Sequence, residues 1–449
     1  MKRPSTISMF EALPANHLRL LVVVATALVV AVLASPAAAT SGTLTITSNT
    51  TLTEDHSGNI VIDADDVTLD CAGHSVIGAG SGLGIYSVRS RLTITGCVVS
   101  GFELGVFLVG SSNSLVTGNR AFDNSNQGIA LNTTDHSRVT GNTVYRNVTT
   151  GIGLAFSDHN TVTHNKAYDN VRAGIDLFFS DDNVVEDNKA TGDGDFGFVL
   201  TEAHRNTISD NASLDSPDHG YFLFRASENA LSGNKADGNG FGGFTLNESD
   251  RNTLTDNSAV SNGHVGFSIF RSDDNWLSGN SAVDNAFAGF ELTESLDNTL
   301  SQNSSKYNDF GINLFQSSSN SIVGNSVLEN SSFGINLNTS DSNVVSDNTA
   351  MKSNIGFAVF LSDGNMLTGN RASRNQTDGF HVNDASSNVF NGNRADRNGA
   401  VGFNVFFGSE LNTFTQNSGC NNAFVDARDT STGAGNTWLN NSFCTTSGV

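Results

Sequence analysis

The sequence predicts an all-β protein, a single-stranded right-handed parallel β-helix of about 17 coils with a 22–24 residue period and an internal asparagine ladder. Three observations predict this fold. An asparagine recurs at a near-constant interval, short apolar stretches alternate with a period of two, and no helical apolar stripe persists within the repeats. The recurring positions are Asn119, Asn142, Asn165, Asn188, Asn211, Asn234, Asn257, Asn280, Asn303, Asn325, Asn348, Asn370, Asn393, Asn417 and Asn441.

Stacking of the coils explains why a polar residue recurs at an inward turn. Corresponding residues of adjacent coils lie one strand spacing apart, about 4.8 Å. An asparagine amide at that spacing can pass hydrogen bonds from coil to coil, and its neighbours satisfy it. With two earlier rungs at Cys71 and Cys97 the ladder has seventeen rungs, which corresponds to a rod about 80 Å long. The right-handed sense follows from the general rule for parallel connections.

Each repeat also holds a Gly-apolar-x-apolar cluster, such as Gly174–Leu177 or Gly243–Leu246. This alternation is typical of a strand with one buried face. We expect the phenylalanines of these clusters to stack along the rod.

The first 39 residues do not belong to the rod. Lys2 and Arg3 precede an apolar run over residues 20–33, and Ala37–Ala39 offers a small-residue cleavage site, the pattern of a secretory signal peptide. The alternative is an uncleaved anchor, for which the run is short. We expect residues 40–65 to form an N-terminal capping segment, 66–444 the β-helix and 445–449 a C-terminal tail. The protein is then secreted, periplasmic or at the cell surface, with no stable transmembrane span after cleavage.

The four cysteines suit an exported protein. Cys71 and Cys97 share the ladder column near one end, and Cys420 and Cys444 share a column of adjacent coils near the other. We therefore predict two disulfides that staple the terminal coils, which lack one neighbour and fray most easily. Two pairs of buried free thiols are the alternative.

The chain has 23 basic and 45 acidic residues and a net charge of −22, so nucleic acid and anionic membranes are poor partners. One acidic column precedes many rungs by six or seven residues, and carboxylates in a row either coordinate a hard cation such as calcium or simply form turns. We expect no other cofactor. The column comprises Asp135, Asp158, Asp181, Asp182, Asp250, Asp273, Asp274, Asp297, Asp341, Asp363 and Glu410.

One local segment concentrates groups that could carry out catalysis. Asp215, Asp218, His219, Tyr221 and Arg225 lie within eleven residues. Abstraction of a proton next to a uronate carboxylate needs a base, an acid and a cation on the carboxylate. The alternative is that this segment is merely an irregular coil.

The stretch NIVIDADDVTLDCAGHSVIGAGSGLGIYSVRSRLTITGCVVSGFELGVFL (Asn59–Leu108) and the asparagine repeats after it resemble the NosD-like right-handed parallel β-helix proteins, also grouped as carbohydrate-binding and sugar-hydrolase β-helices. The resemblance covers about residues 43–444. It implies the fold and a family of secreted surface proteins, polysaccharide lyases, mannuronan C5-epimerases and accessory proteins of nitrous oxide reductase assembly. His219-Gly220 with Arg225 looks similar to an epimerase motif, whereas Asp215-Ser216-Pro217-Asp218 departs from its Asp-Pro-x-Asp order.

The leading functional hypothesis is an exported, non-catalytic protein that binds polysaccharide or another surface polymer along its length. A uronate polysaccharide lyase or mannuronan C5-epimerase-like enzyme acting near His219 is the first alternative. A NosD-like periplasmic accessory protein for metalloenzyme assembly is the second, and it follows from the resemblance alone.

Overall fold

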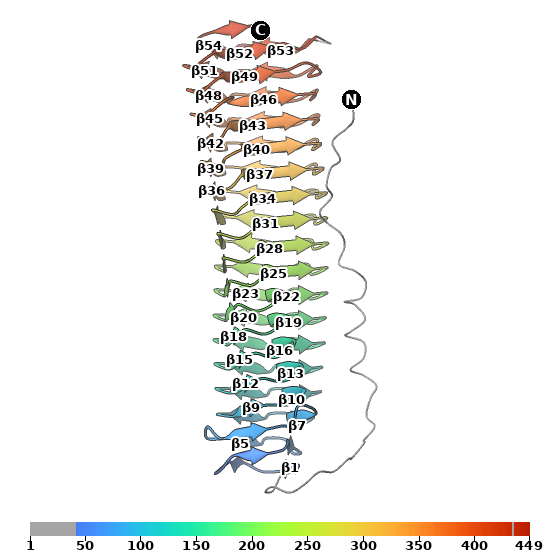
Figure 1. Cartoon of the computed structure of the whole chain (residues 1–449). Helices are drawn as coiled ribbons and strands as arrows, with labels where there is room; N and C mark the ends of the chain where they lie inside the picture. Colours follow the sequence, from blue (N-terminus) through green and yellow to red (C-terminus); the bar gives the residue numbers. More distant parts are fainter. Residues whose placement is uncertain (1–41, 433–434) are drawn as a thin grey trace, which may run out of the picture. The chain divides into compact units, whose positions relative to one another are not determined.

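The computed structural model describes residues 42–432 and 435–449, which form one compact unit. The predicted signal peptide, residues 1–39, lies outside the described residues. The described residues form strands and turns without an α-helix, and no helix among them is long and apolar enough for a membrane span. Successive strands join three parallel sheets in rotation, so every third strand belongs to the same sheet (Figure 1). The fold is the predicted parallel β-helix.

Sheet A has the longest strands and the following bounds: β1 (Leu44–Ile46), β4 (Ile60–Ile62), β7 (Leu83–Ser87), β10 (Leu104–Val109), β13 (Gln127–Asn132), β16 (Thr150–Ala155), β19 (Ala173–Phe178), β22 (Phe196–Thr201), β25 (His219–Phe224), β28 (Gly242–Asn247), β31 (Val265–Phe270), β34 (Ala288–Thr293), β37 (Phe310–Phe315), β40 (Phe333–Asn338), β43 (Ile355–Phe360), β46 (Phe380–Asn383), β49 (Val401–Val405), β52 (Val425–Asp429) and β55 (Thr446–Ser447).

Sheet B follows sheet A in each coil, and its strands are β2 (Thr50–Thr51), β5 (Thr68–Asp70), β8 (Thr93–Thr95), β11 (Leu115–Thr117), β14 (Arg138–Thr140), β17 (Thr161–Thr163), β20 (Val184–Glu186), β23 (Thr207–Ser209), β26 (Ala230–Ser232), β29 (Thr253–Thr255), β32 (Trp276–Ser278), β35 (Thr299–Ser301), β38 (Ser321–Val323), β41 (Val344–Ser346), β44 (Met366–Thr368), β47 (Val389–Asn391), β50 (Thr413–Thr415) and β53 (Thr437–Leu439).

Sheet C completes each coil, and its strands are β3 (His56–Ser57), β6 (Ser75–Ile77), β9 (Val98–Ser100), β12 (Arg120–Phe122), β15 (Thr143–Tyr145), β18 (Lys166–Tyr168), β21 (Lys189–Thr191), β24 (Ala212–Leu214), β27 (Lys235–Asp237), β30 (Ser258–Val260), β33 (Ser281–Val283), β36 (Ser304–Lys306), β39 (Ser326–Leu328), β42 (Thr349–Met351), β45 (Arg371–Ser373), β48 (Arg394–Asp396), β51 (Ser418–Cys420) and β54 (Ser442–Phe443).

The predicted asparagine ladder is present between sheets B and C. The Asn188 backbone N–H and side-chain Nδ2 both donate to Oδ1 of Asn211, at 2.8 and 3.0 Å. Nδ2 of Asn188 also donates to the carbonyl of Val162 in the preceding coil, at 2.8 Å. A buried amide therefore accepts from one neighbouring coil and donates to both, which satisfies its hydrogen-bonding groups inside the rod.

Asparagines also stack at the other two corners of the coil. The recurrence five residues after the first ladder gives a second ladder between sheets C and A, where Asn124 donates to Asn147 at 2.9 Å. A third ladder, between sheets A and B, was not predicted. In it Asn206 donates to Asn229 at 3.1 Å.

An apolar core fills the interior along the rod, with one inward residue from each short strand of sheets B and C and two from each long strand of sheet A. The predicted aromatic stack is present, because Tyr221 lies between Phe198 and Phe244 with ring centroids 4.8 and 4.6 Å away. The stack continues to Phe267 and Phe290.

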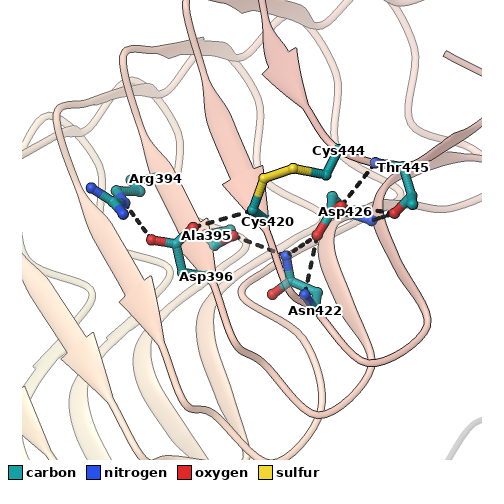
Figure 2. Close-up of a disulfide and its surroundings, with 8 residues drawn as sticks. All are labelled: Arg394, Ala395, Asp396, Cys420, Asn422, Asp426, Cys444 and Thr445. Atoms are coloured by element: carbon teal, nitrogen blue, oxygen red, sulfur yellow. Dashed lines mark hydrogen bonds and ion pairs between the residues drawn. A yellow bond between two sulfur atoms is a disulfide. The ribbon is translucent and has the colours of Figure 1, made fainter.

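Disulfides join both predicted cysteine pairs, Cys71–Cys97 and Cys420–Cys444, and the described residues contain no free cysteine. Figure 2 shows the second bridge between adjacent coils near the C-terminus. The first pair closes a coil that follows the expected capping segment. Within that segment, residues 40–65, the strand β1 already pairs in parallel with β4.

Candidate functional site

The five residues predicted to form a catalytic group lie along β25 and its flanking turns, where an extended strand separates them. His219 begins β25 and Arg225 directly follows its last residue, so their backbones are about 20 Å apart at the rise of a strand. Asp215 is exposed in the preceding turn with a positive φ of 55°. Of the five, the structure brings only Asp218 and His219 together.

Tyr221 points into the core rather than toward solvent. Its side chain is fully buried in the aromatic stack, and its hydroxyl has no hydrogen-bond partner among the described residues. Burial raises the pKa of this hydroxyl well above its usual value. Since strand residues alternate between faces, His219 and Tyr221 should share the inward side, but His219 begins the strand at the turn and its ring is held outside the core.

Arg225 takes part in a surface row of alternating charges. It lies 2.8 Å from Glu248 and 3.8 Å from Glu202, in the coils on either side, and its guanidinium is 4.7 Å from the Phe224 ring centroid. These contacts orient Arg225 toward neighbouring turns.

His219 is buried among aromatic rings outside the main core. Its ring centroid is 6.0 Å from Phe196 and 5.1 Å from Phe222, and Nδ1 lies 3.0 Å from the Thr245 hydroxyl. Its Nε2 lies 3.5 Å from Asp218. Burial lowers the pKa of His219 to about 4, so the imidazole is neutral at pH 7.

The pKa of Asp218 shifts in the opposite direction to that of His219. Burial, and then the charge of Asp195, raise the pKa of its carboxyl above the ordinary value. Arg172, which also interacts with the charge of Asp195, is paired with Asp176. This end of the face therefore holds a neutral histidine in apolar surroundings, and neither His219 nor Asp218 forms an ion pair with a lysine or arginine of the described residues.

The outer face of sheet A carries a continuous row of side chains that are in register from strand to strand. We call this the middle row. Although it faces outward, most of its members are buried, and Val199 and Phe222 belong to an apolar cluster separate from the core. The middle row comprises Asp176, Val199, Phe222, Thr245, Ser268, Glu291, Asn313, Asn336, Ala358, His381, Asn404 and Arg428.

Aromatic rings flank the middle row on both sides. On the side where the strands begin, seven rings from successive coils contact one another, and we call them the near row: Phe196, His219, Phe241, His264, Phe287, Phe310 and Phe333. On the other side, phenylalanines alternate with Thr or Asn in every second coil, and we call them the far row: Phe178, Phe224, Phe270, Phe315 and Phe360.

Amides and one carboxyl form a connected stretch in the centre of the middle row. Asn336 donates to Asn313 at 2.8 Å, and Asn313 donates to Oε1 of Glu291 at 3.4 Å. Burial raises the pKa of Glu291 to about 7. This stretch offers amide and carboxyl groups between two aromatic walls.

A more organised cluster of charged groups lies near the C-terminal end of the same face. The buried Asp378 accepts hydrogen bonds from the Val401 backbone at 3.1 Å and from Asn404 at 2.8 Å. Nδ1 of His381 lies 2.9 Å from Oδ2 of Asp378. Arg428 donates through Nε to Asn404 at 2.9 Å.

This C-terminal cluster borders a cavity of about 500 Å³, which Asp378, Asn404 and Arg428 help to line. Asp378 fixes one nitrogen of His381 and leaves Nε2 without a partner among the described residues. The Arg428 guanidinium, 5.5 Å from the Phe406 ring centroid, keeps its two terminal nitrogens free of hydrogen bonds to described residues. Asp378 thus orients the His381 imidazole and, together with the unpaired Arg428 guanidinium, lines the cavity.

Sequence reasoning did not find this cluster, although a signal was present. His381 and Asn404 occupy the x position of the Gly-apolar-x-apolar cluster, which faces outward on sheet A, and Arg428 is in register with them. Polar residues at x in consecutive repeats mark the middle row, whereas the site predicted at His219 consists of residues from a single repeat.

The acidic column has a structural role in the described residues. Oδ1 of Asp158 accepts the backbone N–H of Asp181 in the next coil at 2.7 Å, and Asp250 accepts that of Asp273 at 2.8 Å. Each such carboxylate caps the turn above it, as side chains of this type commonly do. Among residues 42–432 and 435–449, no group of three or more His, Cys, Asp or Glu side chains is arranged to hold a metal ion.

Comparison with protein families finds one matching model, described as "Periplasmic copper-binding protein (NosD)", over residues 36–212, 154–289 and 283–447. Comparison with curated proteins finds no match.

Several solved structures are similar at low identity. The A-module of a mannuronan C-5 epimerase from Azotobacter vinelandii is 15% identical, with a TM-score of 0.47 over 64% of this chain and 85% of that one. An alginate lyase from Paenibacillus sp. is 13% identical, with a TM-score of 0.36 over 53% of this chain and 94% of that one. The catalytic domain of an α-1,3-glucanase is 16% identical, with a TM-score of 0.37 over 73% and 60%. Nothing about activity follows from similarity at this level.

Proposed function

Because the chain belongs to the NosD family, whose model matches nearly all of the β-helix, we propose that it is an exported family member that binds a polysaccharide or another surface polymer without catalysis. The proposed binding surface is the outer face of sheet A. The observation that carries the proposal is the middle row of polar side chains between two aromatic rows, continuous over successive coils.

The chemistry of this face suits a sugar polymer. Rings of the near and far rows present apolar surface to the C–H faces of sugars. The amide and hydroxyl groups of Thr245, Ser268, Asn313 and Asn336 offer donors and acceptors to sugar hydroxyls. An extended repeat surface allows a polymer to make the same contacts many times, which raises avidity without a deep pocket.

Export is part of the proposal. The two disulfides form and persist in an oxidising compartment, and residues 1–39 have the pattern of a signal peptide. We therefore propose that the protein acts in the periplasm, at the cell surface or outside the cell.

The binding proposal is tested by replacing far-row rings with residues that occupy the same row in adjacent coils. Phe315→Thr with Phe360→Asn copies Thr293 and Asn338. We expect this pair to weaken binding to the polymer by about thirtyfold, because each of the two rings contributes about 1 kcal/mol of stacking. Binding to a panel of neutral and acidic polysaccharides is measured by affinity electrophoresis and calorimetry.

The matched control is Trp276→Thr, which removes an exposed ring from sheet B and copies Thr253 and Thr299 on the adjacent strands. It should leave binding unchanged. Equal loss in both variants, or retention by the far-row variant, would place the polymer elsewhere.

A second candidate function is that of a uronate lyase or C5-epimerase, and the C-terminal cluster favours it. Asp378 orients His381, which could remove the C5 proton of a uronate through Nε2. Arg428 lies two coils on in the same row and could stabilise the charge that develops on the carboxylate. This placement differs from the predicted one at His219, which forms no ion pair with a lysine or arginine of the described residues.

Incubation with alginate and pectin tests the enzymatic candidate. Unsaturated uronates are detected by ultraviolet absorbance and altered C5 configuration by NMR. Loss of activity by at least about a hundredfold in His381→Ala or Arg428→Ala, with activity kept in His219→Ala, would support the C-terminal site. Polymer retention without any product supports the non-catalytic binder.

The third candidate, an accessory role in metalloenzyme assembly, has the family description as its support. Copper prefers imidazole, thiolate and thioether ligands. All four cysteines are in disulfides, and the described residues place no three metal-binding side chains of the His, Cys, Asp or Glu type together. The described residues do not fit a resident copper ion.

A further inference from the structure

Five basic side chains gather on the outer face of sheet C near its C-terminal end, in a protein of net charge −22. Arg371 and Arg394 are paired neighbours on β45 and β48. Lys352, Arg374 and Arg397 occupy the equivalent turn of three successive coils, and the backbone N–H of each donates to the last residue of the sheet C strand in the next coil. We call these five residues the basic patch.

The basic patch encloses a cavity of about 210 Å³. The four arginines contribute to its lining, together with Ser373 and Asp396. Arg371 and Arg394 belong to the strands and Arg374 and Arg397 to the turns that follow, so guanidinium groups flank the cavity on two sides. Cys420, which is in register with Asp396 and also borders the cavity, is bridged to Cys444 (Figure 2).

Counter-charges in the basic patch are few. Arg394 pairs with Asp396, and Lys352 pairs with Glu329 at 2.6 Å. Arg371, Arg374 and Arg397 form no ion pair with any described residue, unlike Arg146, Arg205, Arg225, Arg251 and Arg271 elsewhere on the rod. Like charges directly opposite each other on adjacent strands repel and cost stability. The arrangement is unfavourable unless an anion offsets it.

A buried hydroxyl in the same cavity also lacks a partner. Ser373 is 3% exposed, and its Oγ has no hydrogen bond to any described residue. An unsatisfied buried hydroxyl costs free energy that a ligand acceptor would recover. This observation is independent of the charges and points to the same cavity.

We infer that the basic patch binds a tetrahedral oxyanion, the sulfate or phosphate group of a small ion or of a polymer substituent. Guanidinium groups form bidentate, charge-assisted hydrogen bonds to such oxygens. Donors from two walls and from the Ser373 floor reach the oxygens of a tetrahedral group in several directions. A planar carboxylate has only two oxygens and would leave some of these donors unused.

The test compares the full-length protein with a double variant, Arg371→Ser and Arg397→Asn. Both replacements copy residues that occupy nearby coils in the same columns, Ser326 two coils before Arg371 and Asn421 one coil after Arg397, so the fold is preserved. Calorimetric titration with inorganic phosphate and with sulfate, at constant ionic strength, should show an affinity at least about tenfold weaker in the variant, because two charge-assisted contacts are lost. Acetate at the same concentration should bind the native protein more weakly than phosphate.

The control variant, Arg138→Ser with Lys189→Ser, removes two exposed cations from distant strands and gives the same net charge. It should bind like the native protein. A parallel arm with dextran sulfate distinguishes a polymer-borne group from a free ion, since only the former gains affinity with chain length. Absence of saturable binding in both arms, or equal weakening in the control, would overturn the inference.

Discussion

Single asparagine residues hold this rod together because one side-chain amide both accepts and donates. Asn211 accepts two hydrogen bonds from Asn188 and donates to Val185 at 2.8 Å and to Asn234 at 3.1 Å. Aspartate and serine occur in the same ladders, but neither reproduces this pattern of donors and acceptors. Substitutions at ladder and core positions therefore test the contribution of single hydrogen-bonding groups to stability.

A substitution at Tyr221 tests whether its side chain is buried in the core without a hydrogen-bond partner. Tyr221→Phe removes a buried hydroxyl without a partner while keeping the stack with Phe198 and Phe244. We expect the free energy of unfolding to rise by about 1 kcal/mol, because the cost of desolvating the hydroxyl disappears. Urea unfolding monitored by circular dichroism measures the change. Destabilisation, or loss of any uronate-modifying activity, would mean that the hydroxyl has a partner or a substrate.

Asp193 replaces asparagine in the second ladder and should make stability depend on pH. Burial raises its pKa from the ordinary 3.8 to about 7. Between these values the unfolded chain ionises while the folded chain stays protonated, so stability falls as pH rises through this window and stays reduced above it. Asp193→Asn should increase the free energy of unfolding at pH 8 by about 2–4 kcal/mol and much less at pH 4.

The measurement is urea unfolding of both proteins at pH 4, 6 and 8, in matched ionic strength. Other acids titrate in both proteins, so the difference between them isolates Asp193. A pH-independent difference would indicate that Asp193 is ionised in the folded protein.

At the scale of the strand and the row, the sequence predicted the repeated ladder positions. It did not predict which side chains of sheet A face outward. The period placed equivalent residues such as Asn188 and Asn211 side by side, because stacking depends only on sequence separation. The same alignment did not show that a strand holds Tyr221 inward and carries His219 and Arg225 to opposite ends. The direction of a side chain near a turn depends on the local backbone angles. The pattern of residue types does not determine these angles.

The third ladder and the C-terminal cluster were missed for related reasons. Asn206 and Asn229 recur five residues before Asn211 and Asn234, but the predicted ladder used only the later column. Asp378 and His381 are distant in sequence from Asn404 and Arg428, and only the register of β46, β49 and β52 brings these residues together. Such contacts depend on the register between strands, and the identity of single residues does not reveal that register.

A ladder acts as an element, so breaking one rung should affect both neighbouring coils. Asn211→Ala leaves the backbone N–H and Nδ2 of Asn188 without their acceptor and removes two donated bonds. We expect a loss of about 2–4 kcal/mol in the free energy of unfolding. Asn132→Ala is the control, because Asn132 lies on the outer face of sheet A in line with Ala155. Similar losses in the two variants would argue against a special role of the ladder.

At the scale of the whole molecule, each coil contacts only its neighbours, so the two ends are the weakest places. The bridges Cys71–Cys97 and Cys420–Cys444 lie near these ends. The whole chain has a net charge of −22, whereas the basic patch lies beside the C-terminal bridge. The basic patch and the two disulfides are thus confined to particular coils, although the coils themselves repeat along the rod.

Removal of the C-terminal bridge should loosen one end selectively. In Cys420→Ala with Cys444→Ala, a constraint on a loop with a sequence separation of 24 is lost, which corresponds to about 3 kcal/mol. We expect faster amide hydrogen exchange in β50–β55 and unchanged exchange in β19–β28. The equivalent pair at Cys71 and Cys97 should act at the other end. Uniform acceleration along the chain would show that the rod unfolds as one cooperative body.

The common register of the coils also makes the chain modular in length. Excision of residues 212–234 would bring Asn211 next to Asn257, whose amide can take the place of Asn234. Each sheet would lose one strand, and the cross-section would be unchanged. We therefore expect the fold to tolerate duplication or deletion of a whole repeat. The length of the rod can then change by whole coils without a change in its cross-section.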